Sequence, residues 1–490
     1  MAPDPFQQGT SLLQQGRPAE AAVALRAAVA LQPGLAEAHA NLALALDRVG
    51  EDEAALAHYR RALALAPGRD AAWWNYGAFL ERRKQYAQAE QAYREALRID
   101  PASAPAWSNL GVLLDILRRT AEAEHAHRRA VALAPDWAHA SVNLAECLLR
   151  QGRLDEAWRY FEARDWSKDF AARVGIPRWD GGPLHGRALL IGVEGGQGDM
   201  IQFCRYASEL KRRGASMVGV LCHPGLQALL QRAEGIDHAI AVGPEGGGRV
   251  PDVAWNLWCP APSLPALCAT RLESIPADLP YLHTEPARVA HWERELGREP
   301  GLRVGLAWKG NPRFANDRER SLPGPQALAP LGGIPGVRLF SLQKDTGELG
   351  PGDREAGHAR ATAPHAEPAP EHPQAPPMRA LGPGLRDFAD TAAVLDGLEL
   401  LISVDTAAAH LAGALARPCW VLLPHHKTDW RWLEGRADSP WYPGVMRLYR
   451  QGPGEDWSRV IADVARDLRS LAEAPPARPV PPQGPASTGR

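Results

Sequence analysis

Apolar positions in the first third of the chain follow a helical period, and the whole pattern then repeats. Phrases of the type ALALAP, ALRIDP and AVALAP close at four prolines spaced 34 residues apart, namely Pro33, Pro67, Pro101 and Pro135. Small and large apolar residues recur between them at spacings that place them on one helix face. The pattern predicts antiparallel helix pairs that bury their apolar faces against their neighbours, in about five repeats over residues 5–168.

The third and fourth repeats resemble the tetratricopeptide signature most fully. The matching residues are Trp73, Tyr76, Gly77, Leu80, Ala89, Tyr93 and Ala96 in one repeat and Trp107, Leu110, Gly111, Leu114, Ala123, His127 and Ala130 in the next. Gly and Ala at fixed positions allow the helices to approach closely, and the larger residues fill the groove between them. The first and fifth repeats depart from the signature, as terminal repeats often do.

One asparagine recurs in each of four repeats in the same register, at Asn41, Asn75, Asn109 and Asn143. Each lies about 200° around its helix from the first inward-facing position, so we expect the side chains to face away from the partner helix. Asn is a mediocre helix former, and some interaction should offset that cost. The row is similar to the asparagine ladder of O-linked N-acetylglucosamine transferases, which implies that it binds an acceptor polypeptide. Amides that only bond neighbouring helices or water are the alternative.

After about residue 175 the 34-residue period ends, and short apolar runs alternate with helical phrases. We expect strands at 187–193, 217–222, 239–242, 252–258, 302–308, 337–342, 398–404 and 418–424. We also expect a helix at 200–214 and another in TAAAHLAGALA, directly after Asp405. Such alternation is typical of βαβ units and parallel sheets.

This pattern predicts an α-solenoid followed by two Rossmann-like α/β lobes, at 176–290 and 300–472. The stretch 345–384 is rich in Pro, Ala and Gly, and we expect a flexible insertion there. The tail 474–490 has a similar composition and is predicted to be disordered.

Composition narrows the classes of function. The 490 residues include 55 Lys and Arg against 57 Asp and Glu, and this balance argues against nucleic acid as a partner. Six scattered cysteines without a C-x-x-C pair favour reduced thiols over disulfides or structural zinc. We see no leader peptide and no apolar stretch of about 18 residues, so we expect a cytoplasmic protein without a membrane span.

Two predicted strand-to-helix turns are the places where we expect chemistry, because ligands of open α/β sheets bind there. In the second lobe Asp405 and Thr406 start a helix, and His410 follows one turn later, which suits a phosphate. Further cations and amides follow two other strands, namely Lys309, Asn311 and Arg320 after one and Gln343 and Lys344 after the other. The alternative is that Asp405 or Thr406 only caps the helix while His410 packs beneath it.

In the first lobe the phrase EGGQGD differs from the G-x-G-x-x-G fingerprint, which argues against a dehydrogenase. Its glycines allow a bulky ligand to approach the backbone beside Asp199. We expect Asp199 to act as a general base toward an acceptor hydroxyl, with Glu194 as the competing base. An ordinary N-cap role for Asp199 is the alternative.

Residues 176–470 resemble heptosyltransferase-like glycosyltransferase domains of the two-lobed B type that bacteria join to tetratricopeptide repeats. The resemblance rests on WDGGPLHGRALLIGVEGGQGDMIQFCRY, DFADTAAVLDGLELLISVDTAAAHLAGAL and DWRWLEGRADSPWYPGVMRLYRQ. It implies that Asp199 is the base and that Asp405, Thr406 and His410 bind the donor diphosphate. Ala407 replaces the family's glycine, which leaves the donor open, and a heptose acceptor does not follow.

We find no D-x-D phrase in a strand-end context and no cluster of His and carboxylate residues that would indicate a metal site. We therefore expect no metal, and no cofactor other than the nucleotide sugar that serves as co-substrate. Trp430, Trp432 and Trp441 gather near the C-terminus, where they either pack the domain or stack on a sugar or base.

We therefore expect a glycosyltransferase that transfers a sugar from a nucleotide-activated donor to a protein acceptor held by the repeats. Flagellin or another surface protein is the acceptor that the resemblance suggests. One alternative is a repeat scaffold with a degenerate transferase domain. Another is a transferase that acts on lipopolysaccharide or exopolysaccharide.

Overall fold

The computed structural model describes residues 4–164, 175–243, 254–312, 314, 316–344, 375–454 and 456–473. The chain divides into two compact units, Met1–Asp165 and Trp166–Arg490. Each unit builds its own apolar core, one among the repeat helices and the others against the strands. Within the described residues, no helix is long and apolar enough to cross a membrane.

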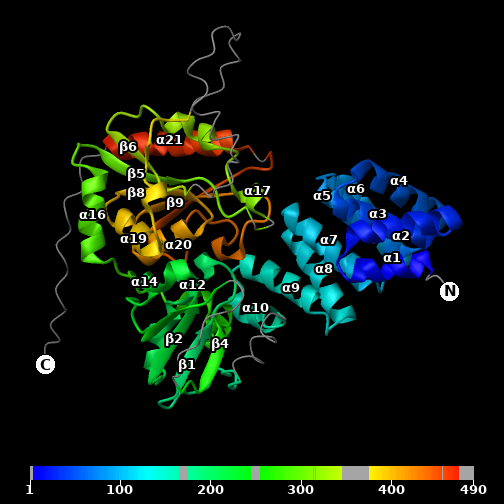
Figure 1. Ribbon diagram of the computed structural model, residues 1–490, viewed down its shortest axis with the longest axis horizontal. Coiled ribbons are helices and arrows are strands. Elements are labelled where there is room, and N and C mark those ends of the chain that lie inside the picture. The colour runs from blue at the N-terminus through cyan, green and yellow to red at the C-terminus, as the bar shows by residue number, and fades with distance from the viewer. Residues whose placement is uncertain are drawn as a thin grey trace, which may run out of the picture. The chain divides into compact units, whose positions relative to one another are not determined.

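Antiparallel helix pairs build the first unit, so the expected α-solenoid is confirmed (Figure 1). Its helices are α1 (Pro5–Gln14), α2 (Pro18–Leu31), α3 (Ala36–Val49), α4 (Asp52–Leu65), α5 (Asp70–Arg82), α6 (Tyr86–Ile99), α7 (Ala104–Ile116), α8 (Thr120–Leu133), α9 (Ala138–Arg150) and α10 (Leu154–Phe161). Glycine allows the closest approaches within a pair. A Cβ atom on Gly77 would lie 2.6 Å from the Tyr93 ring, and one on Gly111 would lie 2.5 Å from the His127 ring.

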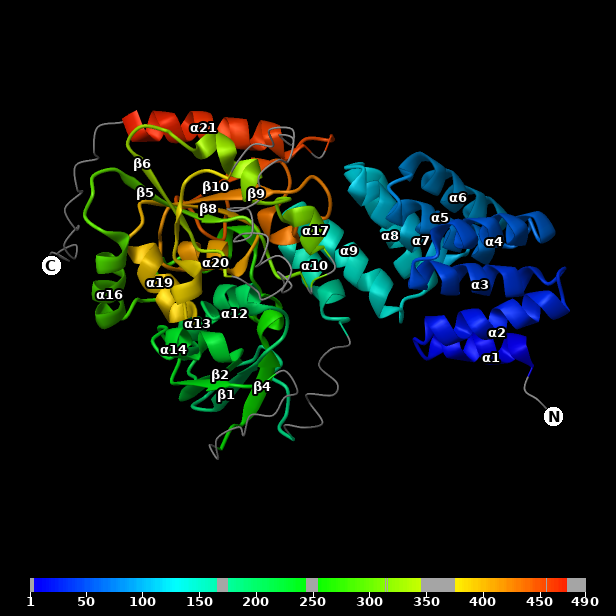
Figure 2. The ribbon, with the colours of Figure 1, turned by 45° about the horizontal axis from the view of Figure 1, so that its top comes forward.

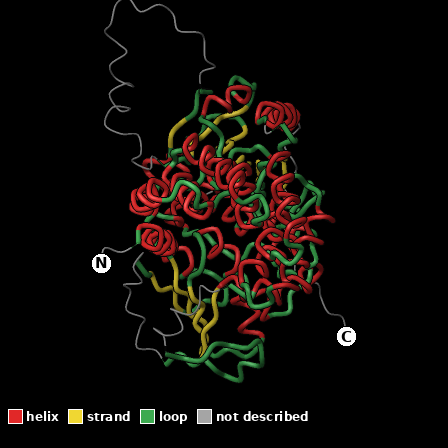
Figure 3. The backbone as a smooth tube through the Cα atoms, turned by 90° about the vertical axis from the view of Figure 1, so that its right-hand side faces the viewer, coloured by secondary structure: helices red, strands yellow, loops and turns green. Residues whose placement is uncertain are grey.

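The second unit is α/β, and its strands gather in two separate sets (Figure 3). In the described residues the first sheet has the order β3-β2-β1-β4, with all neighbours parallel. Its strands are β1 (Ala188–Gly192), β2 (Met217–Cys222), β3 (His238–Ala241) and β4 (Leu257–Pro260). Two short helices, α12 (Gln197–Phe203) and α13 (Tyr206–Arg212), replace the single helix expected at 200–214.

The second sheet has the order β10-β9-β8-β5-β6-β7 in the described residues, again with parallel neighbours. Its strands are β5 (Leu302–Ala307), β6 (Val337–Ser341), β7 (Arg379–Ala380), β8 (Leu400–Val404), β9 (Cys419–Leu423) and β10 (Met446–Arg450). Helix α21 (Trp457–Glu473) covers one face, and α19 (Phe388–Asp396) and α20 (Ala407–Ala414) lie on the other (Figure 2). Further helices of this unit include α14 (Gln227–Leu230), α15 (Leu264–Leu267), α16 (Pro286–Leu296) and α17 (Asp317–Arg320).

Three expectations about these sheets need correction. The insertion expected over 345–384 is ordered in its last ten residues, because Arg379–Ala380 pairs with the edge of β6 and Leu381 is buried. Residues 345–374 and the tail 474–490 lie outside the described residues. Strand β10 is not among the expected strands. Strand β4 begins at Leu257, whereas the expected strand begins at residue 252; residues 252 and 253 lie outside the described residues.

Candidate functional site

A cavity of about 630 Å³ lies at the carboxyl ends of strands from both sheets; we call it the strand-end cavity. Its volume is within the usual range for small-molecule sites. In the second sheet, β5 has β6 on one side and β8 on the other, so the strand order reverses there. The cavity is lined by residues that follow β5 and β8, which is the usual ligand position in open α/β sheets.

Nine residues singled out from the sequence of this unit line the strand-end cavity together. They are Asp199, Lys309, Asn311, Arg320, Gln343, Lys344, Asp405, Thr406 and His410. Glu194, the competing base, is buried and does not belong to the described lining of the cavity.

Asp199 is the third residue of α12, because the helix begins at Gln197. It therefore lies within the first turn and is not the N-cap residue. Its Oδ2 accepts a hydrogen bond from the Gly196 N–H at 2.6 Å, and its Oδ1 forms an ion pair with Arg431. The carboxylate is thus held in place by a backbone donor and a guanidinium.

The N-terminus of α20 offers backbone donors to the cavity. Thr406 is the N-cap residue, but its hydroxyl bonds the Ser403 hydroxyl at 3.0 Å rather than capping the helix. In the described part of the chain no acceptor takes the N–H groups of Ala407 and Ala408, which line the cavity. Such donors at the positive end of a helix dipole favour an anion.

His410 is buried one turn into α20. Its Nδ1 lies 2.9 Å from the Tyr442 hydroxyl, and its ring stacks on Trp432 at 5.2 Å. Burial, helped by the nearby Arg431 charge, lowers the pKa of His410 to about 3. The imidazole is therefore neutral at neutral pH and contributes hydrogen bonds rather than charge.

Asp405 and Asp429 are two further acids that line the cavity. Burial and the nearby Asp429 carboxylate raise the pKa of Asp405 to about 6. Burial alone would raise the pKa of Asp429 as well, but the Arg431 charge and hydrogen bonds outweigh it and keep this pKa below its usual value. Asp405 therefore takes up a proton at a higher pH than Asp429 does.

Two lysines supply positive charge from the second sheet. The Lys309 N–H donates to Gln343 Oε1 at 3.0 Å, which ties together the ends of β5 and β6. In the part of the chain that the structure describes, neither the Lys309 nor the Lys344 ammonium forms an ion pair; the Lys344 Nζ is 3.5 Å from the Arg386 carbonyl oxygen. Arg320 is already paired with Asp317 at 3.1 Å.

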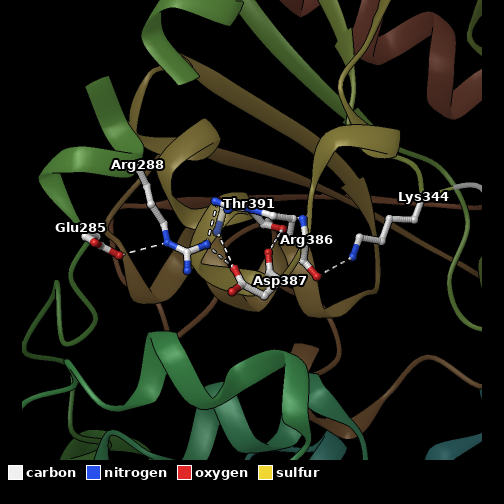
Figure 4. Close-up of polar contacts among 7 residues, drawn as sticks. Glu285, Arg288, Lys344, Arg386, Asp387 and Thr391 are labelled. Atoms are coloured by element: carbon white, nitrogen blue, oxygen red, sulfur yellow. Dashed lines mark hydrogen bonds and ion pairs between the residues drawn. The ribbon is translucent and has the colours of Figure 1, made fainter. Parts of the chain in front are cut away.

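Residues at the N-terminus of α19 also line the cavity, and Figure 4 shows polar contacts around them. Arg288 of α16 donates to Asp387 and to the fully buried Asp390, at 2.7 Å in each case. Arg386 also donates to Asp390, and these hydrogen bonds outweigh burial and lower the pKa of that acid. The network fixes the cavity wall around Asp387 and Thr391.

Sequence reasoning missed several polar residues of the lining, among them Arg386, Asp387, Thr391, Asp429 and Arg431. They lie within phrases quoted above for the family resemblance or directly beside them, but no glycine-rich turn marks them. The tryptophans Trp430, Trp432 and Trp441 are buried, and they pack the domain. Within the described residues, no group of three or more His, Cys, Asp or Glu residues could hold a metal ion.

The asparagines of the repeats are half-buried on the first helices of their pairs. Asn41 donates to the Thr10 hydroxyl in α1, and Asn143 donates to the Ser108 hydroxyl in α7, both at 3.0 Å. Asn75 donates to a carbonyl in its own helix. Two of the four amides therefore link neighbouring repeats.

Comparison with protein families identifies the repeats. Residues 6–70 and 109–169 match the family described as "Tetratricopeptide repeat". Residues 39–117 match "Cilia and flagella-associated protein 70 middle TPR-like domain".

The chain is also similar to protein FlbA of Caulobacter vibrioides, with 29% identity over 352 residues. The match includes 67% of this chain, more than the repeat unit contains, so it extends into the second unit. It spans 54% of FlbA, so the chain covers about half the length of that relative.

Solved structures are also similar to parts of the chain. A structure titled for Pseudomonas aeruginosa pilF has 25% identity and a TM-score of 0.33, covering 43% of this chain and 86% of that one. A thermophilic TPR protein of Thermus thermophilus has 27% identity and a TM-score of 0.31, covering 35% of this chain and 94% of that one. The family matches and the helix pairs together make the N-terminal unit a tetratricopeptide-repeat solenoid, followed by an α/β unit with parallel sheets.

Proposed function

We propose that the protein is a glycosyltransferase that transfers a sugar from a nucleotide-activated donor to a polypeptide bound by its repeats. The observation that carries the proposal is that three kinds of group line one cavity. They are the Asp199 carboxylate, from the helix that follows β1, the ammonium groups of two lysines that follow strands of the second sheet, and the N–H groups at the start of α20. The two parallel sheets suit the two-lobed B type of transferase. The sequence resemblance is the second support.

In the proposed reaction the donor phosphate lies against the N-terminus of α20. The N–H groups of Ala407 and Ala408 and the ammonium groups of Lys309 and Lys344 stabilise the negative charge that develops on the leaving group. The neutral His410 and the Thr406 hydroxyl add hydrogen bonds. Asp199 takes the proton from the acceptor hydroxyl as the new glycosidic bond forms and the phosphate departs. No metal or further cofactor is needed for these steps.

The acceptor part of the proposal rests on the solenoid. We assign the half-buried row of Asn41, Asn75, Asn109 and Asn143 to an extended polypeptide, because an amide can both donate to and accept from a peptide backbone. Flagellin or another surface protein is the acceptor that we propose, on the sequence resemblance alone. We place the reaction in the cytoplasm, and the six free cysteines suit a reducing compartment.

The test begins with the full chain and a panel of nucleotide sugars, followed by mass spectrometry of bound and hydrolysed donor. Asp199→Asn should lower transfer by about 10² to 10⁴-fold, the usual contribution of a general base. Lys309→Ala and Lys344→Ala should each weaken donor binding by about tenfold through a lost charge-assisted contact. Arg459→Ala, an exposed change on α21 outside the cavity, is the matched control.

Binding of a nucleotide sugar without turnover would instead favour a scaffold with a degenerate site. Donor turnover with labelling of a glycan but not of a protein would move the acceptor to lipopolysaccharide or exopolysaccharide. Unchanged binding and rate in all three cavity variants would contradict the proposed site.

A further inference from the structure

Arg431 is a buried cation at the wall of the strand-end cavity, with only 10% of its side chain exposed. Its Nη1 donates to both carboxylate oxygens of Asp429, at 2.8 and 3.0 Å, and its Nη2 pairs with Asp199. The rings of Trp430 and Phe203 cover the guanidinium at 4.5 and 5.2 Å. Arg431 therefore connects the turn after the first strand with the loop after β9.

The charges on this wall do not suit an anion as they stand. Three acids, Asp199, Asp405 and Asp429, surround the one guanidinium, beside the helix end that offers its N–H groups to the cavity. Even below pH 6, where Asp405 is protonated, the carboxylates of Asp199 and Asp429 still oppose the Arg431 guanidinium. An incoming phosphate would meet repulsion there unless the cation turned toward it.

The two carboxylates hold Arg431 unequally. Asp429 takes two hydrogen bonds from Nη1 and a third from the Arg431 backbone N–H at 2.9 Å, from only two residues away in the chain. Asp199 takes a single hydrogen bond, from Nη2, across from another element. The guanidinium Nε is buried with no acceptor in the described residues, so its donors are not all satisfied. Arg431 therefore loses fewer hydrogen bonds when it leaves Asp199 than when it leaves Asp429.

We propose that Arg431 is a phosphate ligand that exchanges partners. When a phosphate-bearing ligand enters the cavity, Nη2 leaves Asp199 and binds a phosphate oxygen, while Nη1 stays on Asp429. The exchange frees Asp199 Oδ1, and Oδ2 keeps its bond from the Gly196 N–H. This inference rests on the proposed function, because it assigns the phosphate to the N-terminus of α20. It makes Asp199 available as a base only when a donor is bound.

The exchange predicts that substitutions of Asp199 and of Arg431 change the affinity for phosphate in opposite directions. Calorimetric titration of the full chain with inorganic pyrophosphate, and with nucleoside mono- and diphosphates, measures these changes. Asp199→Asn removes the competitor for Nη2 and should tighten binding by about tenfold. Arg431→Gln removes the phosphate ligand and should weaken binding by about tenfold. The double variant should bind like Arg431→Gln. The matched control is Arg436→Gln, whose arginine pairs with Asp438 and lies outside the cavity lining.

Unchanged or weaker binding in Asp199→Asn overturns the exchange, because a purely structural ion pair gives no gain when it is removed. Arg431→Gln leaves buried acids without their cation; if it does not fold, the isosteric Asp199→Asn and the charge-conserving Arg431→Lys decide the question. Lysine lacks the planar fork, so Arg431→Lys should also bind more weakly. Binding by none of the proteins, wild type included, contradicts the phosphate site and the proposed function. Equal binding by all of them contradicts the exchange alone.

Discussion

Two buried side chains of the strand-end cavity have pKa values displaced in opposite directions. Burial disfavours the charged form of both groups, so it raises the pKa of Asp405 to about 6 and lowers that of His410 to about 3. Their Oδ1 and Nε2 atoms are 3.9 Å apart. At neutral pH this pair is therefore an ionised acid beside a neutral imidazole, although burial disfavours the charged form of both groups.

The pH dependence of stability should reveal Asp405. Folding raises the pKa of Asp405 from its ordinary value of 3.8 to about 6. Between these two pH values the folded state binds more protons than the unfolded chain does, so the stability of the wild type falls as the pH rises. Asp405→Asn removes this loss, so the thermal midpoint of the variant relative to wild type should rise between pH 4 and 6. The gain above pH 6 is on the order of 3 kcal/mol. Calorimetry of the full chain measures it, and a difference that stays flat with pH contradicts the pKa.

The contribution of His410 to folding stability should change with pH in the opposite direction. Its pKa falls on folding, so wild type gains stability as pH rises from about 3 to 6.5, where the unfolded chain binds more protons. The stability of His410→Gln relative to wild type should therefore decrease over the same window. The same calorimetric series tests this, and slopes of equal sign in the two variants would show that burial is not the cause.

At the scale of elements, the repeats depend on glycines where one helix meets its partner. In α7, Gly111 faces His127 of α8, which is fully buried and bonds Asp115 at 3.0 Å. That hydrogen bond fixes the imidazole, so it cannot easily move away from an added methyl group. The pattern of small residues in the sequence thus has a direct steric cause.

Gly111→Ala should destabilise the solenoid. The new Cβ would lie 2.5 Å from the His127 ring, and the overpacking should exceed the better helix propensity of alanine, for a net loss of about 1 to 2 kcal/mol. Gly34→Ala is the control, because a Cβ atom on Gly34 would meet no other atom within 4 Å. Urea unfolding followed by circular dichroism gives both values. Equal midpoints for the two variants would contradict the steric account.

At the scale of the whole molecule, the proposed function divides the work between the units. Under that proposal the solenoid would bind the acceptor, and the α/β unit would bind the donor and carry out transfer. Each unit has its own core, so changes in one should leave the chemistry of the other intact.

Changing Asn41, Asn75, Asn109 and Asn143 to alanine tests this division. Donor hydrolysis should persist, while protein labelling should fall sharply, because each lost backbone contact costs about 1 kcal/mol. The variant also loses the bonds of Asn41 to Thr10 and of Asn143 to Ser108. Thr10→Ala with Ser108→Ala is therefore the matched control, since it breaks the same bonds and keeps the amides. If the control loses labelling equally, the row only supports the solenoid.

Much of the architecture could be predicted from contiguous residues. The 34-residue period predicted the helix pairs, and the apolar runs around Ile191, Leu306, Ile402 and Val421 predicted buried parallel strands, because periodicity and burial are local properties of a segment. The turns that end at Asp199 and Thr406 were visible for the same reason.

Only the tertiary structure decided how those turns are used. The pairing of Asp199 with Arg431, the neutral state of His410 and the raised pKa of Asp405 all depend on segments far apart in the chain. The same holds for β10 and for Arg379–Ala380, which become strands by pairing with an edge already present. A sequence states which groups are available, but distance and exclusion of water set their charge and partners, and both arise only when the chain is packed.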